Sequence, residues 1–583
     1  MSSLQELNQM RRTPEWVGVS TGNTAIDKAF AISVDLVEDL TRQYHEQKGQ
    51  KGWLPVSGGV RGHMTSRFDT RDSAHAVKMA AYLWGSETDL GATLENSMFI
   101  EYINPETGAL AHPFSTFTRN KAIGVAAGMY LRCVSDTFRY FAPAGNFNEA
   151  MRRAALTADW MVATFDPERS GLLDCRNEHG KCFWGAHLGE ANHFPPNFDP
   201  KSKTVVATMA FCVWLRRMTE AARSKNHPAT GHFEKLLKLY SSTIEEKAWS
   251  DRGGYYHCQF DRISDKWFFS MNGLSEKSRE TDIIPYYCAE SDIDMEHKRC
   301  VARHLDNALT HDRIFPMPIY YPNYAWYSPQ HPNFTDHGVD KFIMGGSWDT
   351  PYFHCVQLLS QMGLAEALEL AVRKRAEAIA RDGDCTEWYH LDGTIDHQTG
   401  YHRDRYLVSA TAQIAATIEG LFGITPAEPG FSVINFAPLL PLFRRHRHTG
   451  PLTEANQAPK TIRITLPEGR RLEFSISYNE SEEKIKVKTN KLDAKGIFRI
   501  PIDYAGRVQN ADWGGVPVQF TIVKLMGQSF ITLEHVLDGK ELVIGLAPHP
   551  QKGKGTTPFI EVSPTGEVTL KGCGSPTPSP AVF

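Results

Sequence analysis

The sequence of 583 residues predicts a mainly α fold, an α/α toroid, followed by a C-terminal antiparallel β-sandwich. Apolar residues recur at helical spacing from the N-terminal region to about residue 430. From about 431 they alternate with polar residues, which is the pattern of strands with one buried face. Long loops rich in glycine, proline and aromatic residues separate the helices, and helix pairs joined in this way suggest a toroid. An irregular helical bundle is the alternative.

The helical part is predicted to contain about eleven helices. Strong helical periodicity covers 27–47, 72–85, 119–139, 147–164, 202–223, 231–247, 350–381 and 405–422, and weaker signals lie at 89–102 and 293–310. Gly363 divides 350–381 into two helices, because a glycine commonly follows the last turn of a helix. We expect residues 1–430 to form one catalytic domain.

The β-sandwich is predicted over residues 431–550. The stretch TIRITLPEGRRLEFSISYNESEEKIKVKTN alternates apolar and polar residues, and further strands are expected at 497–501, 517–524, 528–534 and 541–545. Such a module rarely carries chemistry, so we expect it to pack against the helices. Residues 551–583 end in KGCGSPTPSPAVF and are predicted to form a flexible tail.

Composition and targeting signals exclude several classes of protein. The chain has 63 Lys and Arg against 67 Asp and Glu, a net charge of −4, which argues against a nucleic-acid partner. The N-terminus lacks the apolar stretch of a secretory signal, and no run approaches 18 apolar residues. We therefore expect a cytoplasmic protein with no membrane partner. The ten cysteines form no C-x-x-C pair, so no metal site or cofactor is implied, and the oligomeric state stays open.

Candidate functional residues lie in the loops, because the loops at one end of a toroid converge on a central funnel. The segment 67–75 (RFDTRDSAH) holds Asp69, Arg71, Asp72 and His75 within one helix start. Buried charges need partners or a ligand, which suggests substrate binding. For Asp72 the alternative is a helix cap.

The loop 171–198 is the second candidate segment. It brings Glu190 close in sequence to Trp184, His187 and Phe194. A carboxyl group among aromatic side chains has a raised pKa, which suits a general acid. The alternative is a set of solvated loop residues.

Two further segments are rich in aromatic residues and glycine. Six aromatic residues in 315–327 suggest either stacking platforms for sugar rings or a packed Ω-loop. In 345–354 (GGSWDTPYFH), Trp348 and Asp349 start a helix, so Asp349 either binds sugar hydroxyls or caps that helix.

The segment 385–405 carries the strongest signal. Glu387 is followed by Trp388, and Tyr401 and His402 lead into the last predicted helix of the toroid. A carboxylate that faces a second carboxyl group across a funnel is the arrangement that inverting glycoside hydrolysis requires. We therefore predict that Glu387 is a catalytic residue.

Two stretches resemble the six-hairpin, or (α/α)6-barrel, glycosidase superfamily, and the layout is most similar to α-L-rhamnosidases. They are DTRDSAH and the longer region from TEWYHLDG through GYHRDRYLVSATAQIAATIEGLFGITPAEPGFSVINFAPLLP. The resemblance implies an exo-type inverting hydrolase that removes a terminal sugar, with Glu387 matching the base. Where those enzymes carry the acid glutamate this chain has Thr65, so Glu190 is the predicted acid.

The sequence leaves two alternative functions. Polysaccharide lyases share this barrel, including a rhamnosyl-glucuronate lyase, and β-elimination uses Arg, His and Tyr side chains to neutralise a uronate and move protons. Arg71, His75, His112, Arg119, His187 and Tyr401 are available for that chemistry. The second alternative is a catalytically inactive barrel that binds glycans.

Overall fold

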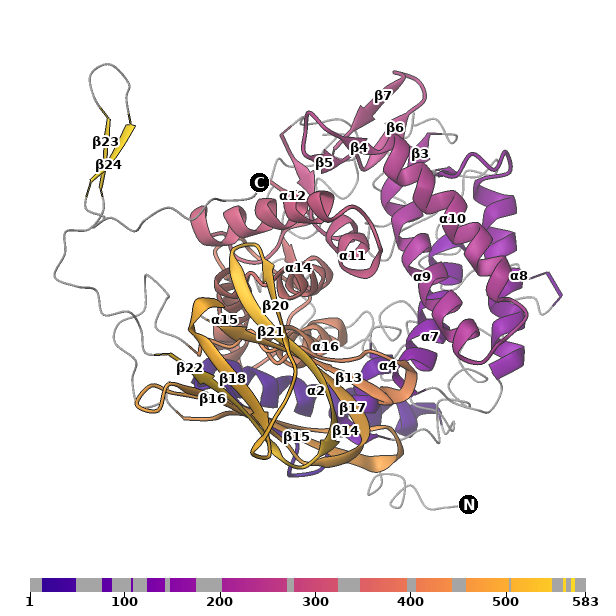
Figure 1. Ribbon diagram of the computed structural model, residues 1–583. Coiled ribbons are helices and arrows are strands. Elements are labelled where there is room, and N and C mark those ends of the chain that lie inside the picture. The colour runs from indigo at the N-terminus through magenta and orange to yellow at the C-terminus, as the bar shows by residue number, and fades with distance from the viewer. Residues whose placement is uncertain are drawn as a thin grey trace.

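The structure is a computed structural model, shown in Figure 1. It describes residues 13–48, 76–85, 106–107, 123–141, 147–174, 202–269, 277–322, 346–395, 405–442, 458–502, 505–547, 559–562 and 568–571. These residues form an α-rich region and several β-sheets.

Six helical segments follow one another around a ring. They are α4 (Val77–Met79) with η1 (Ala80–Trp84), α7 (Ile123–Phe141), α9 (Val205–Ser224), α11 (Ile283–Glu290), α14 (Asp349–Met362), and α16 (Leu407–Ala415) with η6 (Ala416–Leu421). Each contacts the next in this order. Glu419 of η6 accepts hydrogen bonds from Lys78 Nζ (3.2 Å) and Tyr82 Oη (3.1 Å), which joins the last segment to the first. The arrangement is consistent with the predicted toroid.

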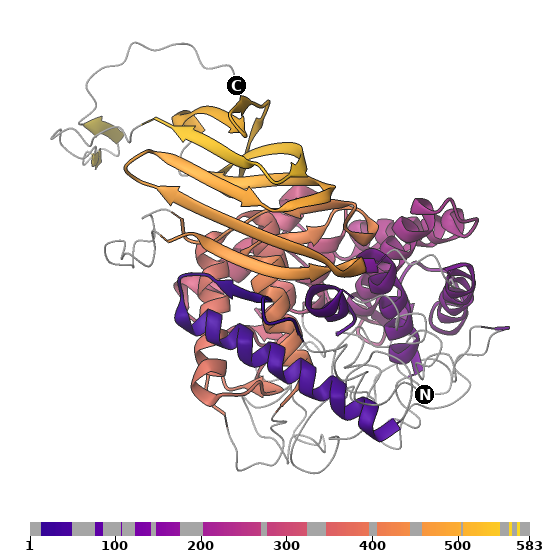
Figure 2. The same ribbon diagram turned by 90° about the horizontal axis from the view of Figure 1, so that it is seen from below.

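Five helices lie outside this ring. They are α2 (Thr24–Lys48), α8 (Phe147–Phe165), α10 (Thr230–Lys247), α12 (Met295–Asp306), which continues into η4 (Asn307–His311), and α15 (Ala365–Asp382). Each contacts one or two of the inner segments, and α2 packs along α15 and α16 (Figure 2). From α7 to α16 inner and outer helices alternate along the described chain, so the N-terminal ends of these inner helices share one end of the ring.

The structure confirms most of the predicted helices and adds one. Gly363, with φ +75°, separates α14 from α15 as predicted. Helix α11 was not predicted, because all but one of its eight residues are buried. A helix that is buried on every side has no polar face, so its sequence shows no amphipathic period.

Two larger sheets follow the helices in sequence. One contains β1 (Gly18–Ser20), β14 (Lys460–Leu466), β15 (Arg470–Asn479), β16 (Lys484–Thr489), β22 (Glu541–Leu546), β18 (Val508–Trp513) and β19 (Val516–Pro517) in that order. The other contains β12 (Ile424–Pro426), β13 (Val433–Phe436), β17 (Lys491–Ile502), β21 (Gln528–Asp538) and β20 (Thr521–Leu525). Phe436 of the second sheet stacks on Phe474 of the first (5.2 Å between ring centroids), so side chains of the two sheets contact each other.

The prediction of purely antiparallel sheets is wrong for one pair, because β13 and β17 pair in parallel. Between these strands the chain forms β14, β15 and β16 in the other sheet, so no hairpin sets their relative direction. β1 belongs to the first sheet and β12 to the second, although both strands lie outside residues 431–550. The predicted domain boundaries stay predictions. Within residues 551–583, which were predicted to form a flexible tail, β23 (Phe559–Val562) pairs with β24 (Val568–Lys571).

The sheets pack against the C-terminal end of the inner helices. The ring of Phe431 lies 6.0 Å from the rings of both Tyr82 and Tyr140. Arg499 of β17 donates hydrogen bonds to the carbonyl oxygens of Ser360 (2.8 Å) and Gln361 (2.9 Å) in the last turn of α14. Figure 2 shows the sheets, in orange and yellow, on one side of the helices. The described part of the candidate segment 345–354 lies at the other end of the ring, where α14 begins.

Candidate active site

Short strand pairs bring three of the predicted segments together. β10 (Ser347–Trp348) pairs with β11 (Trp388–Tyr389), and Trp348 lies opposite Trp388. The backbone N–H of Trp348 also donates to the carbonyl of Met317 (3.1 Å), next to the bridge between Pro318 and Ser347. The segments 315–327, 345–354 and 385–405 therefore meet where α14 begins, as expected for loops that converge on one site.

Glu387 is buried in this loop cluster. Its exposed fraction is 3%, and that of the neighbouring Trp388 is 1%. The ring of Trp388 lies 5.0 Å from His390 in an edge-to-face contact. The backbone N–H of Tyr406 donates to the carbonyl of Cys385 (2.8 Å), which fixes the loop where α16 starts. Glu387 is therefore a buried residue directly before β11, next in sequence to the Trp388 that faces Trp348.

Asp349, the first residue of α14, has a partner within the protein. It forms a buried ion pair with Arg375 of α15. Arg375 also donates to Ser409 Oγ (3.0 Å) and lies 4.3 Å from the centroid of the Tyr389 ring. Burial lowers the pKa of Arg375 to about 10. That Asp349 contacts a sugar stays a prediction. One carboxylate oxygen of Asp349 already forms the ion pair with Arg375.

Sequence reasoning missed three polar side chains at the start of α11 and within α14. Asp282, which directly precedes α11, shares a hydrogen bond of 2.7 Å with His354 Nδ1. The Tyr286 ring stacks on the His354 ring at 4.2 Å. Asp282 and His354 have exposed fractions of 0%, and that of Tyr286 is 1%. The available signal was a pair of acidic residues, Glu280 and Asp282, directly before an apolar run.

Glu280 and Asp282 are two buried carboxyl groups that share one site. Burial raises the pKa of Asp282 to about 8, and burial together with the Asp282 charge raises the pKa of Glu280. Glu280 accepts backbone N–H bonds from Asp282 (2.9 Å), Ile283 (2.8 Å) and Ile284 (2.8 Å). Because three donors at a helix N-terminus favour a carboxylate on Glu280, we expect the proton that the two groups share to reside on Asp282. Burial also lowers the pKa of His354 well below its usual value, so its imidazole is neutral.

Several buried polar atoms of α11, α14 and the elements beside them have no hydrogen-bond partner among the described residues, as do others elsewhere in the described chain. Most buried polar groups in proteins are paired, so each exception needs an explanation such as a ligand or an ordered water molecule. The atoms are Asp282 Oδ2, Tyr286 Oη, Asp349 Oδ2, Thr350 Oγ1, His354 Nε2, Arg375 Nε and Nη1, Tyr389 Oη and Gln413 Nε2.

The remaining predicted site residues lie outside the described part of the chain. They are the predicted acid Glu190 and the predicted substrate-binding residues Asp69, Arg71, Asp72, His75, Trp184, His187, Tyr401 and His402. Within the described ranges, no group of three or more His, Cys, Asp and Glu side chains has the arrangement of a metal site.

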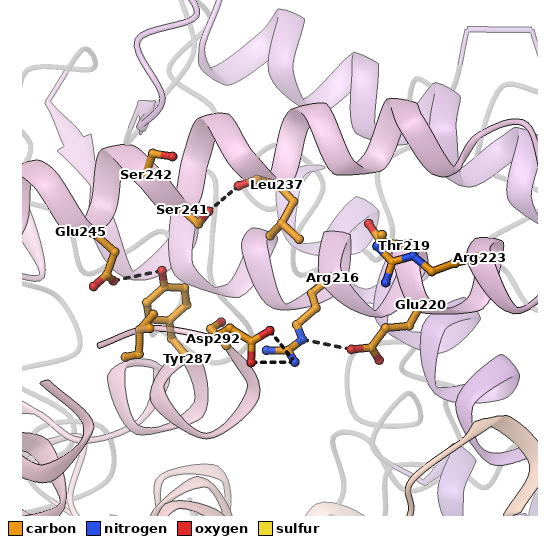
Figure 3. Close-up of a pocket in the computed structure, with 12 residues that line it drawn as sticks. Arg216, Thr219, Glu220, Arg223, Leu237, Ser241, Ser242, Glu245, Tyr287 and Asp292 are labelled. Atoms are coloured by element: carbon orange, nitrogen blue, oxygen red, sulfur yellow. Dashed lines mark hydrogen bonds and ion pairs between the residues drawn. The ribbon is translucent and has the colours of Figure 1, made fainter. Parts of the chain in front are cut away.

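A separate cleft lies on the flank of the ring, between α9, α10 and α11 (Figure 3). Its volume is about 380 Å³, and none of the predicted site residues lines it. Arg216 pairs there with Glu220 (3.0 Å) and Asp292 (3.1 Å), and Tyr287 Oη donates to Glu245 (3.2 Å). The charges of this cleft are paired with one another at a partly exposed surface, unlike the buried groups beside Glu387.

Comparisons with known proteins agree on the fold. No family model matches the sequence, and no curated protein matches it. An α-L-rhamnosidase from Dictyoglumus thermophilum has a TM-score of 0.58 at 11% identity, over 91% of this chain and 50% of that one. A Streptomyces avermitilis α-L-rhamnosidase complexed with L-rhamnose gives 0.53 at 12% identity, over 88% and 41%, and the Aspergillus terreus enzyme gives 0.52 at 11%, over 89% and 50%.

The chain spans half or less of the length of these rhamnosidases. At such low identity the likeness concerns the fold alone. Among the described residues, no helix combines the length and the hydropathy that crossing a membrane requires. The chain therefore shares the fold of these α-L-rhamnosidases, as its sequence motifs predicted.

Proposed function

We propose that this protein is an exo-type inverting glycoside hydrolase that removes a terminal sugar from an oligosaccharide or glycoside, as α-L-rhamnosidases do. The observation that carries the proposal is the position of Glu387. Its carboxyl group is 3% exposed, it directly precedes Trp388, and Trp388 pairs with Trp348 where the inner helices begin. We also propose that the helical part is a complete (α/α)6 toroid and that the two larger sheets form a β-sandwich.

In this proposal Glu387 is the general base. It removes a proton from a water molecule as that water attacks the anomeric carbon, and a second carboxyl group protonates the leaving oxygen. Glu190 is the proposed acid, and an inverting mechanism requires the two carboxyl groups to lie about 6.5–9.5 Å apart. Trp348 and Trp388 supply apolar surface against the C–H face of the sugar ring. Asp349 and the predicted substrate-binding residues of the loops 67–75, 171–198 and 396–405 hold its hydroxyl groups.

The experiment is a screen of the purified protein against aryl glycosides, α-L-rhamnosides included, and uronate-containing oligosaccharides. Each reaction is followed for released sugar and for the ultraviolet absorbance of an unsaturated elimination product. Sugar release without that absorbance supports the hydrolase. Absorbance that grows with product assigns the chain to the lyases, and binding without turnover assigns it to the glycan-binding barrels.

Glu387→Gln tests the role of the base. We expect turnover to fall by about 10²–10⁴-fold because the amide cannot accept the proton of water. Asp392→Asn is the matched control, since Asp392 is an exposed carboxylate of the same loop that bonds only its neighbour Thr394 (2.6 Å to Oγ1). Melting temperatures of both variants should stay near that of the wild type. Near-normal turnover by the Glu387 variant would remove Glu387 from the mechanism.

A further inference from the structure

Asp282, Tyr286 and His354 form a compact polar cluster, here called the floor cluster. Asp282 and Tyr286 are one helical turn apart at the start of α11, and the backbone N–H of Tyr286 donates to the Asp282 carbonyl (3.3 Å). His354, on the neighbouring helix α14, contacts both side chains through the 2.7 Å hydrogen bond and the 4.2 Å ring stack. Two packed helices therefore fix the positions of all three groups.

Each member of the floor cluster carries one polar atom without a partner among the described residues. These atoms are Asp282 Oδ2, Tyr286 Oη and His354 Nε2, and all three side chains are more than nine-tenths buried. With Asp282 protonated and His354 neutral, Asp282 donates to His354 Nδ1, so Nε2 carries the imidazole hydrogen. The cluster thus offers one acceptor and two donors to a ligand, since a phenol also donates. Leaving such groups unsatisfied is costly, so something polar occupies the space beside them when the site works.

The floor cluster faces the interior of the ring. Besides burial, the charges of Arg132 on α7 and Lys78 on α4 lower the pKa of His354. The ring neighbours of α14 are α11 and α16, so these two cations lie across the ring from His354. Along α14, His354 is five residues beyond Asp349, roughly 7.5 Å at the rise of an α-helix. The cluster therefore lies below the Trp348–Trp388 pair, on the side of the ring interior.

We propose that Asp282, Tyr286 and His354 form the floor of the pocket for the terminal sugar and bind its hydroxyl groups. Hydroxyl groups both donate and accept, so two or three of them satisfy the acceptor and the two donors together. In these protonation states all three groups of the floor cluster are uncharged, so the proposal commits to a neutral sugar and not to a uronate.

The inference rests on the proposed function, and its test measures binding without turnover. In a Glu387→Gln background, binding of L-rhamnose, D-glucose, D-mannose and D-glucuronate is measured by calorimetry, and unfolding is measured by heat. Tyr286→Phe removes only the unpartnered hydroxyl and keeps the ring on His354. We expect the affinity for the neutral sugar that binds best to fall about 10-fold or more. The melting temperature should stay equal or rise, because a buried unsatisfied hydroxyl is lost.

Tyr240→Phe is the matched control. Tyr240 is also buried, but its hydroxyl donates to Asp166 (3.0 Å) on the outer side of the ring. Its removal should lower the melting temperature and leave sugar affinity unchanged. The two tyrosine variants therefore change stability and affinity in opposite ways, and a merely structural role for Tyr286 would not produce that pattern.

The outcomes separate the inference from the proposed function. Unchanged affinity in Tyr286→Phe means that the floor holds only water, and it overturns the inference whether or not glycosides are cleaved. Failure of every sugar to bind in the Glu387→Gln background, or tighter binding of glucuronate than of the neutral sugars, also overturns it. If Tyr286→Phe weakens sugar binding while the wild type cleaves no glycoside, the inference that the floor cluster binds sugar is supported and the hydrolase proposal fails.

Discussion

The two ends of the helical ring treat buried charge differently. Toward the C-terminal end of the inner helices, opposite charges meet: Arg217 pairs with both Asp136 and Glu290, and Arg139 pairs with Glu290 (2.9 Å). Of the polar atoms of Arg217, only Nε lacks a partner among the described residues. At the N-terminal end, Asp282, Tyr286 and His354 are just as buried, but each keeps one polar atom without a described partner.

This difference separates stability from function. Removing a polar group from water costs free energy at either end. At the C-terminal end the chain offsets that cost with its own ion pairs, beside the sheets that pack there. At the N-terminal end the offset must come from outside the described chain, from a ligand or from water. Buried groups that the protein leaves unsatisfied are therefore a better guide to the site than buried charge as such.

The largest expected effect is at the paired end. Arg217→Met removes the cation that serves Asp136 and Glu290, and it leaves two buried carboxylates with less compensation. We expect unfolding to become easier by about 3–5 kcal/mol, as for other broken buried ion pairs. Denaturant unfolding followed by circular dichroism measures this change.

Arg223→Met, on the same helix, is the control for the Arg217 variant. Arg223 pairs with Glu234 (2.7 Å) at an exposed site, so its loss should change stability by at most about 1 kcal/mol. Sugar affinity should survive in the Arg223 variant. Arg217 lies 5.6 Å from the centroid of the Tyr286 ring, so only unfolding is compared for the Arg217 variant. Equal effects of the two substitutions would show that the network at the C-terminal end does not stabilise the ring.

A smaller effect is expected at the ion pair of Asp349 with Arg375. This pair lies at the N-terminal end of α14, but its opposite charges meet within the protein, as at the C-terminal end. Asp349→Asn removes the charge that compensates a buried guanidinium, which should cost about 2–3 kcal/mol. The double variant Asp349→Asn with Arg375→Met should recover part of that loss, because no buried cation then remains. Unfolding free energies of the three variants form a double-mutant cycle. Losses that simply add would show that Asp349 acts independently of Arg375, as a sugar ligand would.

Much of the fold could be predicted from the sequence, and the exceptions have physical causes. Amphipathic outer helices such as α2 and α10 show a clear period, because one face is in water. Helix α11 is buried on almost every side and shows none. The parallel pairing of β13 and β17 was not predictable from alternation, because alternation shows which residues face the core and not which strands are neighbours.

The sequence indicated candidate segments where polar and aromatic residues are dense, and the structure brings two of these segments together. Trp348 and Trp388 come from separate loops and meet across β10 and β11, so those two segments were informative. The floor cluster was missed because Asp282 and His354 are 72 residues apart and each is a single polar residue in an apolar stretch. Only the packing of α11 against α14 brings them together. The roles of Glu387 and Glu190 stay predictions.

The smallest effect concerns pH, and it tests whether Asp282 holds a proton in the folded protein. The pKa of an aspartate is about 3.9 in an unfolded chain, and burial raises that of Asp282 to about 8. Between these values the folded state binds more protons than the unfolded state, so stability falls as pH rises. For one proton the slope is at most about 1.4 kcal/mol per pH unit, and it vanishes above the folded pKa.

Asp282→Asn should therefore flatten the decline of the unfolding free energy between about pH 5 and pH 8 relative to the wild type. Glu280 stays buried in this variant, and burial is the main cause of its raised pKa, so the flattening should be partial and the slope due to Glu280 should remain. Glu149→Gln is the control, because two arginines lower the pKa of that exposed carboxylate to about 2. A slope unchanged by Asp282→Asn would place the shared proton elsewhere. The donor and acceptor pattern of the floor would then have to be reassigned, with His354 Nδ1 donating to an ionised Asp282.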